Sequence, residues 1–242
     1  MSAKNKIEVC HSPALFPFHK NDEAVVVAID ILRATTSIVT AFMNGVNRII
    51  PVGTLEEAKA LKAQGYRVAA ERDGIVRDFA DFGNSPFNFS EERVKGNDIV
   101  YSTTNGTHTI MIAKDAHLVT IGSYLNISAL RDLIFEQDRD LLLLCAGWKN
   151  RFNLEDTLFA GALAEMVLES DRFYTICDSA LGAIDLWNVA NTDIMGYIDK
   201  VAQRSRLRKN GLDDVIEYCH TVDTTRLIPV LKENYIVEIN QL

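Results

Sequence analysis

The chain has 242 residues, of which 48% are hydrophobic and 24% are charged. This balance is typical of a globular protein with a sizeable core, and it excludes an intrinsically disordered chain. The formal net charge of −8 argues against nucleic acid or an anionic membrane as the main partner, because both carry charge of the same sign. A small anionic substrate stays compatible, provided that arginines, helix N-termini or a metal ion receive it.

The cysteines and the N-terminus bear on the cellular compartment. Cys10, Cys145, Cys177 and Cys219 form no CxxC pair and are too sparse for a disulfide scaffold or a zinc finger. The N-terminal residues lack the apolar stretch of a signal peptide, and no segment reaches the ~20 apolar residues of a membrane span. We therefore expect a reduced cytoplasmic protein with no membrane partner. A homodimer is compatible with a 27.0 kDa chain, although no segment indicates an interface.

From residue 24 to the middle of the chain, short apolar runs alternate with segments of helical period. The apolar runs predict strands at residues 24–29, 48–52, 67–70, 98–101, 118–121 and 140–146. Helices are predicted at residues 36–44, 54–65, 107–113, 127–136 and 154–168, the second of them opening with Thr54 and Glu57 in capping-box spacing. This alternation predicts a three-layer α/β/α fold, with helices on both faces of a mainly parallel sheet.

The remaining segments are less regular. Residues 72–92 contain Gly74, Gly83 and Pro86 and are predicted to form a long loop, which in compact domains is often functional. Beyond residue 170, helices are predicted at residues 178–191, 193–204 and 212–220, and a last strand at residues 227–236. No internal repeat or linker divides the sequence. We therefore expect one domain over residues 1–242, with a helical C-terminal portion.

Five polar clusters directly follow predicted strands, at the edge of an open parallel sheet where ligands bind. They are residues 30–36, 71–72, 102–107, 122–123 and 147–156. Asp30 can bind Mg²⁺ or attack phosphorus as a nucleophile; alternatively, it caps the next helix. Arg33 can fork onto a phosphate, sulfonate or carboxylate, although a surface ion pair is the commoner role of an arginine.

Two further clusters allow two interpretations each. Residues 103–107 (TTNGT) can present backbone donors and small polar side chains to an anion, or can form an Asn-Gly turn before a helix. Glu155 and Asp156 fall in the first turn of a predicted helix, where acidic residues interact with the helix dipole or bind a metal ion. The cationic run Arg204, Arg206, Arg208 and Lys209 is predicted to be a solvated helix face; alternatively, one of its arginines faces the substrate.

Several catalytic motifs are absent from the sequence, namely HExxH, GxSxG, the Walker A loop and GxGxxG. Their absence removes the sequence support for a zinc protease, a serine hydrolase and a nucleotide-dependent kinase or transferase.

Taken together, the polar segments resemble the 2-phosphosulfolactate phosphatase family, whose members dephosphorylate phosphosulfolactate on the route to coenzyme M. The resemblance rests on residues 30–36 (DILRATT), 71–72 (ER), 81–86 (DFGNSP), 103–107 (TTNGT), 122–123 (GS) with Asn126, 145–147 (CAG), 155–157 (EDT), 160–161 (AG) and, more weakly, 228–229 (IP). These segments cover most of the chain in the right order. The chain departs from the family at Ala70, Phe79 and Ala80, where the family has glycine. We therefore expect a reshaped pocket, whose substrate is phosphosulfolactate or another phosphorylated hydroxy acid.

The resemblance implies a three-layer α/β fold, a Mg²⁺ requirement and hydrolysis of the phosphate monoester of a small anionic acid. The candidate catalytic residues are then Asp30, Arg33 and Asp156, and the candidate metal ligands are Asp30, Glu71 and Asp156. The candidate substrate-binding residues are Arg72, Ser85, Thr104, Asn105, Gly106 and Thr107. Whether Asp30 is the nucleophile or a metal ligand stays open, and a non-catalytic small-anion-binding protein on the same fold is the alternative function.

Overall fold

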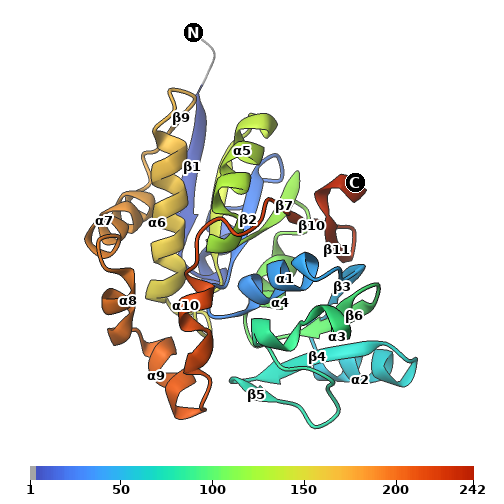
Figure 1. Ribbon diagram of the computed structural model, residues 1–242. Coiled ribbons are helices and arrows are strands. Elements are labelled where there is room, and N and C mark those ends of the chain that lie inside the picture. Colours follow the sequence, from blue (N-terminus) through green and yellow to red (C-terminus); the bar gives the residue numbers. More distant parts are fainter. Residues whose placement is uncertain (1–3) are drawn as a thin grey trace.

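The computed structural model describes residues 4–242, within which eleven strands form one mixed sheet in the order β5-β4-β6-β3-β11-β10-β7-β2-β8-β1-β9 (Figure 1). The strands are β1 (Asn5–Cys10), β2 (Val25–Ile29), β3 (Arg48–Pro51), β4 (Arg67–Arg72), β5 (Ile75–Val76), β6 (Asp98–Ser102), β7 (Leu118–Gly122), β8 (Leu141–Cys145), β9 (Phe173–Tyr174), β10 (Pro229–Lys232) and β11 (Tyr235–Glu238). The predicted α/β class with a mainly parallel sheet is confirmed.

Helices of two kinds connect the strands. The α-helices are α1 (Ala34–Met43), α2 (Leu55–Ala63), α3 (Glu91–Val94), α4 (Gly106–Ile112), α5 (Ile127–Gln137), α6 (Leu154–Leu168), α7 (Asp178–Ala190), α8 (Ile194–Tyr197), α9 (Ala202–Lys209) and α10 (Ile216–Cys219). Short 3-10 helices are η1 (Pro13–Phe18), η2 (Pro86–Asn88), η3 (Tyr124–Asn126), η4 (Ile198–Lys200), η5 (Asp213–Val215) and η6 (Ile239–Gln241). No helix among residues 4–242 is long and apolar enough to cross a membrane.

The sheet consists of two parallel groups joined by a hairpin. Strands β7, β2, β8, β1 and β9 pair in parallel, and so do β3, β6 and β4. Between the groups, β10 and β11 pair antiparallel with each other, with β7 and with β3. Three antiparallel pairings reverse the chain direction, so a flat sheet would separate the carboxyl ends of the two groups. Asp30, after β2, and Glu71, in β4, nevertheless line one pocket, so residues of the two groups meet there.

Side chains that alternate along the strands divide the core into layers. On β2, Val25 and Val27 pack in one hydrophobic cluster with residues of α5 and α6, while Val26 belongs to a second cluster with residues of α1 and α4. On β6, Ile99 faces the α1 and α4 layer, and Val100 packs against residues next to α2 on the other face. Helices therefore cover both faces of the sheet, as predicted for three layers. This packing places α1 and α4 between the two parallel groups, beside their converging ends.

Some predicted elements differ from the structure. Residues 5–10, which carry no strand signal beyond a short mixed run, form β1 because β8 and β9 flank them. The predicted strand at residues 227–236 is a hairpin, since Glu233 adopts a left-handed backbone (φ 56) between β10 and β11. The predicted helix at residues 193–204 is interrupted by the extended backbone of Val201, and α9 starts after it. Residues 212–220 form η5 and α10, and the predicted long loop contains β5 and η2.

Gly161 lets α6 pack closely against α7. A Cβ atom on Gly161 would lie 2.1 Å from the carbonyl oxygen of Ala183. We therefore expect Gly161→Ala to lower the free energy of unfolding by about 1–3 kcal/mol, measured by urea denaturation. The matched control is Gly182→Ala in α7, where a Cβ atom meets nothing within 4 Å; this helical exchange should raise stability by about 0.5–1 kcal/mol. Unchanged stability of Gly161→Ala would contradict this explanation of the helix contact.

Candidate active site

Asp30 lies directly after β2 and faces two helix starts. Its Oδ1 atom accepts a hydrogen bond from the backbone N–H of Ala34 at 3.2 Å, and its own backbone N–H donates to Thr35 Oγ1 at 3.0 Å. Asp30 therefore closes the turn that leads into α1, so part of the capping role expected from the sequence is present. Its Oδ2 atom lies on the side of Gly106, at the start of α4.

Arg33, the residue before α1, is a buried cation. Arg33 is only 4% exposed, and its Nη1 atom has no hydrogen-bond partner among residues 4–242. Burial lowers the pKa of Arg33, while the negative charges of Glu71 and Asp30 act in the opposite direction. Leaving a buried charge without a paired anion is energetically costly. An anionic ligand beside Arg33 would remove this cost.

The first turn of α6 supplies two acidic side chains. Asp156 accepts hydrogen bonds from the backbone N–H of Ile31 at 2.9 Å, from that of Gly147 at 3.1 Å and from Asn153 Nδ2 at 2.9 Å. It thereby ties the segment after β2 to the segment after β8. Glu155 is 2% exposed and accepts from Asn153 Nδ2 at 3.0 Å, while its Oε2 atom is buried with no partner in the described residues.

Asp30, Glu155 and Asp156 influence one another electrostatically. Burial is the largest cause that raises the pKa of each of these three carboxyl groups above its usual range. The charge of Asp156 raises the pKa of Asp30 further, that of Asp30 raises the pKa of Glu155, and that of Glu155 raises the pKa of Asp156. Mutual repulsion of this kind is relieved by a nearby cation or by a shared proton.

Glu71, in β4, connects the second parallel group to the site. Its Oε1 atom accepts from the backbone N–H of Thr104 at 2.7 Å, and its Oε2 atom accepts from that of Gly74 at 2.6 Å. Both oxygens are thus engaged in holding the loops after β4 and β6. Arg72, the next residue, donates to the carbonyl of Glu71 at 2.7 Å and to Ser102 Oγ at 3.0 Å.

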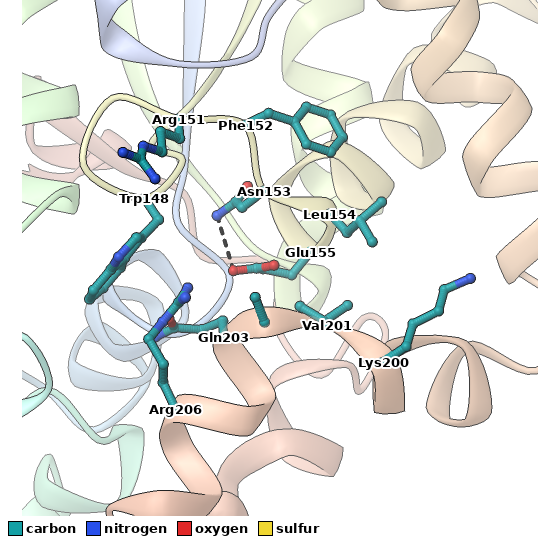
Figure 2. A pocket seen from close by; sticks show the side chains of 11 residues that line it. Trp148, Arg151, Phe152, Asn153, Leu154, Glu155, Lys200, Val201, Gln203 and Arg206 are labelled. Atoms are coloured by element: carbon teal, nitrogen blue, oxygen red, sulfur yellow. Dashed lines mark hydrogen bonds between the residues drawn. The ribbon is translucent and has the colours of Figure 1, made fainter.

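Two neighbouring cavities meet at these residues. The inner pocket, of about 20 Å³, is lined by Asp30, Leu32, Arg33, Glu71, Gly74, Asn84, Asn105, Trp148, Gln203 and Leu207. The outer pocket, of about 390 Å³, is lined by Trp148, Arg151, Phe152, Asn153, Leu154, Glu155, Lys200, Val201, Ala202, Gln203 and Arg206 (Figure 2). Because Trp148 and Gln203 line both, the pockets adjoin at these two side chains.

The structure brings part of the predicted site together. Asp30, Arg33, Glu71 and Asn105 line the inner pocket, and Gly106 lies against Asp30. Asp156 is not in the lining but holds Ile31 from behind. Among residues 4–242, no three histidine, cysteine or acidic side chains are close enough to hold a metal ion by themselves, so the candidate metal ligands do not form one compact cluster.

The other predicted binding residues line neither pocket. Thr104 donates its hydroxyl to Glu71, and Thr107 exchanges hydrogen bonds with Thr103. Ser85 directly precedes η2 and is buried. Its neighbour Asn84, and not Ser85 itself, lines the inner pocket. Arg72, the last residue of β4, donates hydrogen bonds to Glu71 and Ser102. The departures from the family pattern at Ala70, Phe79 and Ala80 lie in or against the small cluster next to α2, outside both pockets.

The sequence interpretation missed lining residues that come from distant segments. These are Asn84, Trp148, Gln203, Leu207 and Arg206. Trp148 belongs to a cluster that was recognised, next to a strand end. Arg206 belongs to the run for which a solvated face was predicted and a substrate-facing arginine was the alternative. Which arginine of the run faces a pocket depends on how α9 packs, and the local pattern does not encode that packing.

Gly106 is required by the close approach of α1 and α4. A Cβ atom there would lie 2.4 Å from the Cβ of Ala34 and 2.9 Å from Asp30 Oδ2. We expect Gly106→Ala to displace Asp30, to lower stability by about 1–3 kcal/mol in urea denaturation and to reduce any activity that depends on Asp30 at least about tenfold. A Gly106→Ala variant with wild-type activity would show that Asp30 tolerates this shift. Gly65→Ala is no suitable control, because Gly65 has a positive φ; Gly182→Ala serves instead.

Comparison with known proteins gives a consistent result over nearly the whole chain. The profile of a family described as 2-phosphosulpholactate phosphatase matches residues 10–234. A relative from Clostridium acetobutylicum is 36% identical over 213 residues, covering 87% of this chain and 89% of that protein. Relatives from Thermotoga maritima and Gloeobacter violaceus are each 35% identical, covering 85% and 93% of this chain and 88% and 94% of their own lengths. All three relatives are named probable 2-phosphosulfolactate phosphatase.

Proposed function

We propose that this chain, which belongs to the 2-phosphosulfolactate phosphatase family, hydrolyses the phosphate monoester of 2-phosphosulfolactate or of a closely related small phosphorylated hydroxy acid. The products are sulfolactate, or the corresponding hydroxy acid, and inorganic phosphate. Family membership makes the chain a phosphoric monoester hydrolase and disfavours the non-catalytic anion-binding alternative. The identity of the acid and the requirement for Mg²⁺ are the parts that we propose.

One observation carries the proposal: the buried guanidinium of Arg33 has an unpaired nitrogen, and Arg33 lines the inner pocket together with Asp30. A phosphoryl group supplies oxygen acceptors that match the planar fork of an arginine. Asp30, on the same pocket wall, is then placed next to the bound phosphoryl group. As a carboxylate it can attack phosphorus or bind a metal ion, and both roles require its charged form. The structure supports its position and leaves these two roles open.

The donor set of the site fits Mg²⁺. Asp30 would supply carboxylate oxygens from the inner pocket. Burial and then the charge of Asp156 raise the pKa of Asp30, and a divalent cation would stabilise the charged form of these carboxyl groups. Asp156 lies behind the lining, and both of its oxygens already accept N–H groups. Mg²⁺ in such sites commonly uses one or two carboxylates together with waters and substrate phosphates, so a compact cage of three side chains is not needed. Glu71 is the third candidate ligand, although its two oxygens already accept backbone N–H groups. When bound, Mg²⁺ would neutralise negative charge that develops on the phosphoryl group.

The proposal is tested by phosphate release from four esters, each measured with Mg²⁺ and with EDTA. The esters are racemic 2-phosphosulfolactate, phospholactate, phosphoglycerate and p-nitrophenyl phosphate. We expect the fastest release from the sulfonated ester, and its loss in EDTA with recovery when Mg²⁺ is added back. Faster release from another ester would contradict the proposed substrate but would still support phosphate ester hydrolysis. If folded protein releases no phosphate from any of the four esters, the proposed hydrolysis is wrong. The cytoplasmic location, a homodimer and a place in coenzyme M synthesis stay predictions from the sequence.

A further inference from the structure

Helix α9 carries three arginines with different surroundings. Arg204 pairs with Asp199 at 3.3 Å and with Asp213 at 3.4 Å, and Arg208 pairs with the same two carboxylates at 2.5 and 3.1 Å. These contacts join α9 to η4 and η5. Arg206 lies between them in sequence but forms no ion pair with any of residues 4–242, and it lines the outer pocket instead. The charge of Arg206 is therefore not used to hold the C-terminal helices together.

Two contacts fix the orientation of Arg206. Its Nε atom donates to Gln203 Oε1 at 2.7 Å, and its guanidinium carbon lies 4.1 Å from the centroid of the Trp148 ring. Figure 2 shows the guanidinium reaching from α9 toward Trp148 and Glu155. Burial lowers the pKa of Arg206 and the charge of Glu155 raises it, yet an arginine stays protonated under such shifts. Stacking and one hydrogen bond leave its two terminal nitrogens available to an anion.

Gln203 links this arginine to the inner pocket. While its Oε1 atom accepts from Arg206, its Nε2 atom donates to the carbonyl oxygen of Leu32 at 3.1 Å, in the residue before Arg33. One buried side chain therefore helps to set the positions of both guanidinium groups. The two arginines belong to adjoining pockets, with Trp148 and Gln203 between them.

The sizes of the pockets indicate how a substrate would be shared between them. The inner pocket, at about 20 Å³, admits only a small group, such as one end of a substrate. The outer pocket, at about 390 Å³, has the size of a small-molecule site. Arg151 and Lys200 add positive charge to its lining. A phosphate ester whose reacting end lies at Arg33 would thus extend its remaining groups past Trp148 toward Arg206.

We propose that Arg206, held by Trp148 and Gln203, is a specificity-determining residue that binds a non-reacting anionic group of the substrate, a sulfonate or a carboxylate. The inference rests on the proposed function and names the residue that distinguishes phosphate monoesters with such a second anionic group from esters without one. Arg33 then binds the phosphoryl end and Arg206 the opposite end. Trp148 and Gln203 are positioning residues, since they act through Arg206.

The test compares Arg206→Gln with the matched control Arg208→Gln, which removes a neighbouring arginine of the same helix. For Arg206→Gln we expect kcat/KM on 2-phosphosulfolactate to fall about 100-fold, and kcat/KM on p-nitrophenyl phosphate, which lacks a second anionic group, to fall less than about threefold. Arg208→Gln should change neither value more than about threefold. Trp148→Ala should lose about tenfold on 2-phosphosulfolactate, and Trp148→Phe should restore most of this loss, because a ring remains for stacking.

Equal losses of kcat/KM on both esters in Arg206→Gln would overturn the inference, because Arg206 would then support the whole site. Unchanged kcat/KM on both esters would also overturn it. Failure of the proposed function looks different: the wild-type protein would hydrolyse neither ester. In that case, calorimetric titration with sulfolactate decides. Binding to the wild type that weakens about 100-fold in Arg206→Gln and persists in Arg208→Gln would support the anion-binding role of Arg206. Equal binding by the wild type and Arg206→Gln, or no binding to the wild type, would overturn it.

Discussion

Asp30→Asn is expected to reduce kcat on 2-phosphosulfolactate by about 1,000-fold or more while the protein folds normally. The exchange keeps the shape of the side chain and an oxygen that can accept from Ala34 N–H, but it removes the negative charge. A nucleophile and a metal ligand both depend on that charge, so the loss is expected under either role. The measurement is steady-state phosphate release, with urea denaturation to verify folding.

The control for this variant is Asp171→Asn, which changes an exposed carboxylate whose ion pair with Lys4 spans 3.9 Å. It should retain wild-type activity. Asp30→Asn is also expected to be at least as stable as the wild type, because it removes a charge whose burial raises the pKa of the group. Activity of Asp30→Asn within about tenfold of the wild type would contradict a central role for this carboxylate.

Arg33→Lys is expected to lower kcat/KM by about 100-fold or more on every phosphate ester, p-nitrophenyl phosphate included. Lysine keeps the positive charge but loses the planar fork that matches phosphoryl oxygens. Because Arg33 is assigned to the phosphoryl group that all the esters share, its loss should not depend on the rest of the substrate. This pattern separates Arg33 from Arg206, whose exchange should affect only esters with a second anionic group.

Arg33→Met tests whether this arginine serves stability or ligand binding. Its Nη1 atom is buried without a partner among residues 4–242, so replacing the cation by an apolar side chain should leave the free energy of unfolding unchanged or higher. Arg33→Met should nevertheless lose activity as Arg33→Lys does. A marked loss of stability in urea, or selective retention of p-nitrophenyl phosphate hydrolysis by Arg33→Lys, would contradict the assignment.

The elements that the sequence predicted well are those specified by local patterns. The run VVVAI is apolar throughout because β2 is buried on both faces, and this run alone indicates a central strand. The capping box of α2 is formed as expected, with Thr54 Oγ1 accepting from Glu57 N–H at 3.1 Å and Thr54 N–H donating to the Glu57 carboxylate at 3.0 Å. Such short-range signals do not depend on how the rest of the chain packs.

The elements that the sequence did not predict depend on distant partners. Strand β1 is stabilised by pairing with β8 and β9, which come more than a hundred residues later. The hairpin β10–β11 enters the middle of the sheet from the C-terminus and reverses the direction of one parallel group relative to the other. No local period encodes this insertion, and it determines where the two sets of strand ends meet.

The candidate site shows the same division. Asp30, Glu71 and Asn105, which were selected because they lie at predicted strand ends, line one pocket. Placement at a strand end did not predict side-chain direction, so Arg72 and Thr104 lie nearby yet take part in hydrogen bonds around Glu71. Residues from remote segments could not be found in this way. Gln203 and Arg206 reach the pockets only because α9 packs beside the segment that follows β2, a contact that Gln203 makes with Leu32.

The most direct test of the central claim is a crystal structure of the protein with Mg²⁺ and tungstate, a tetrahedral oxyanion that imitates the phosphoryl group. We expect tungstate in the inner pocket, with its oxygens within about 2.7–3.2 Å of the Arg33 guanidinium nitrogens and beside Asp30. Tungstate bound elsewhere, with Arg33 still unpaired, would contradict the assignment of this pocket as the phosphatase active site.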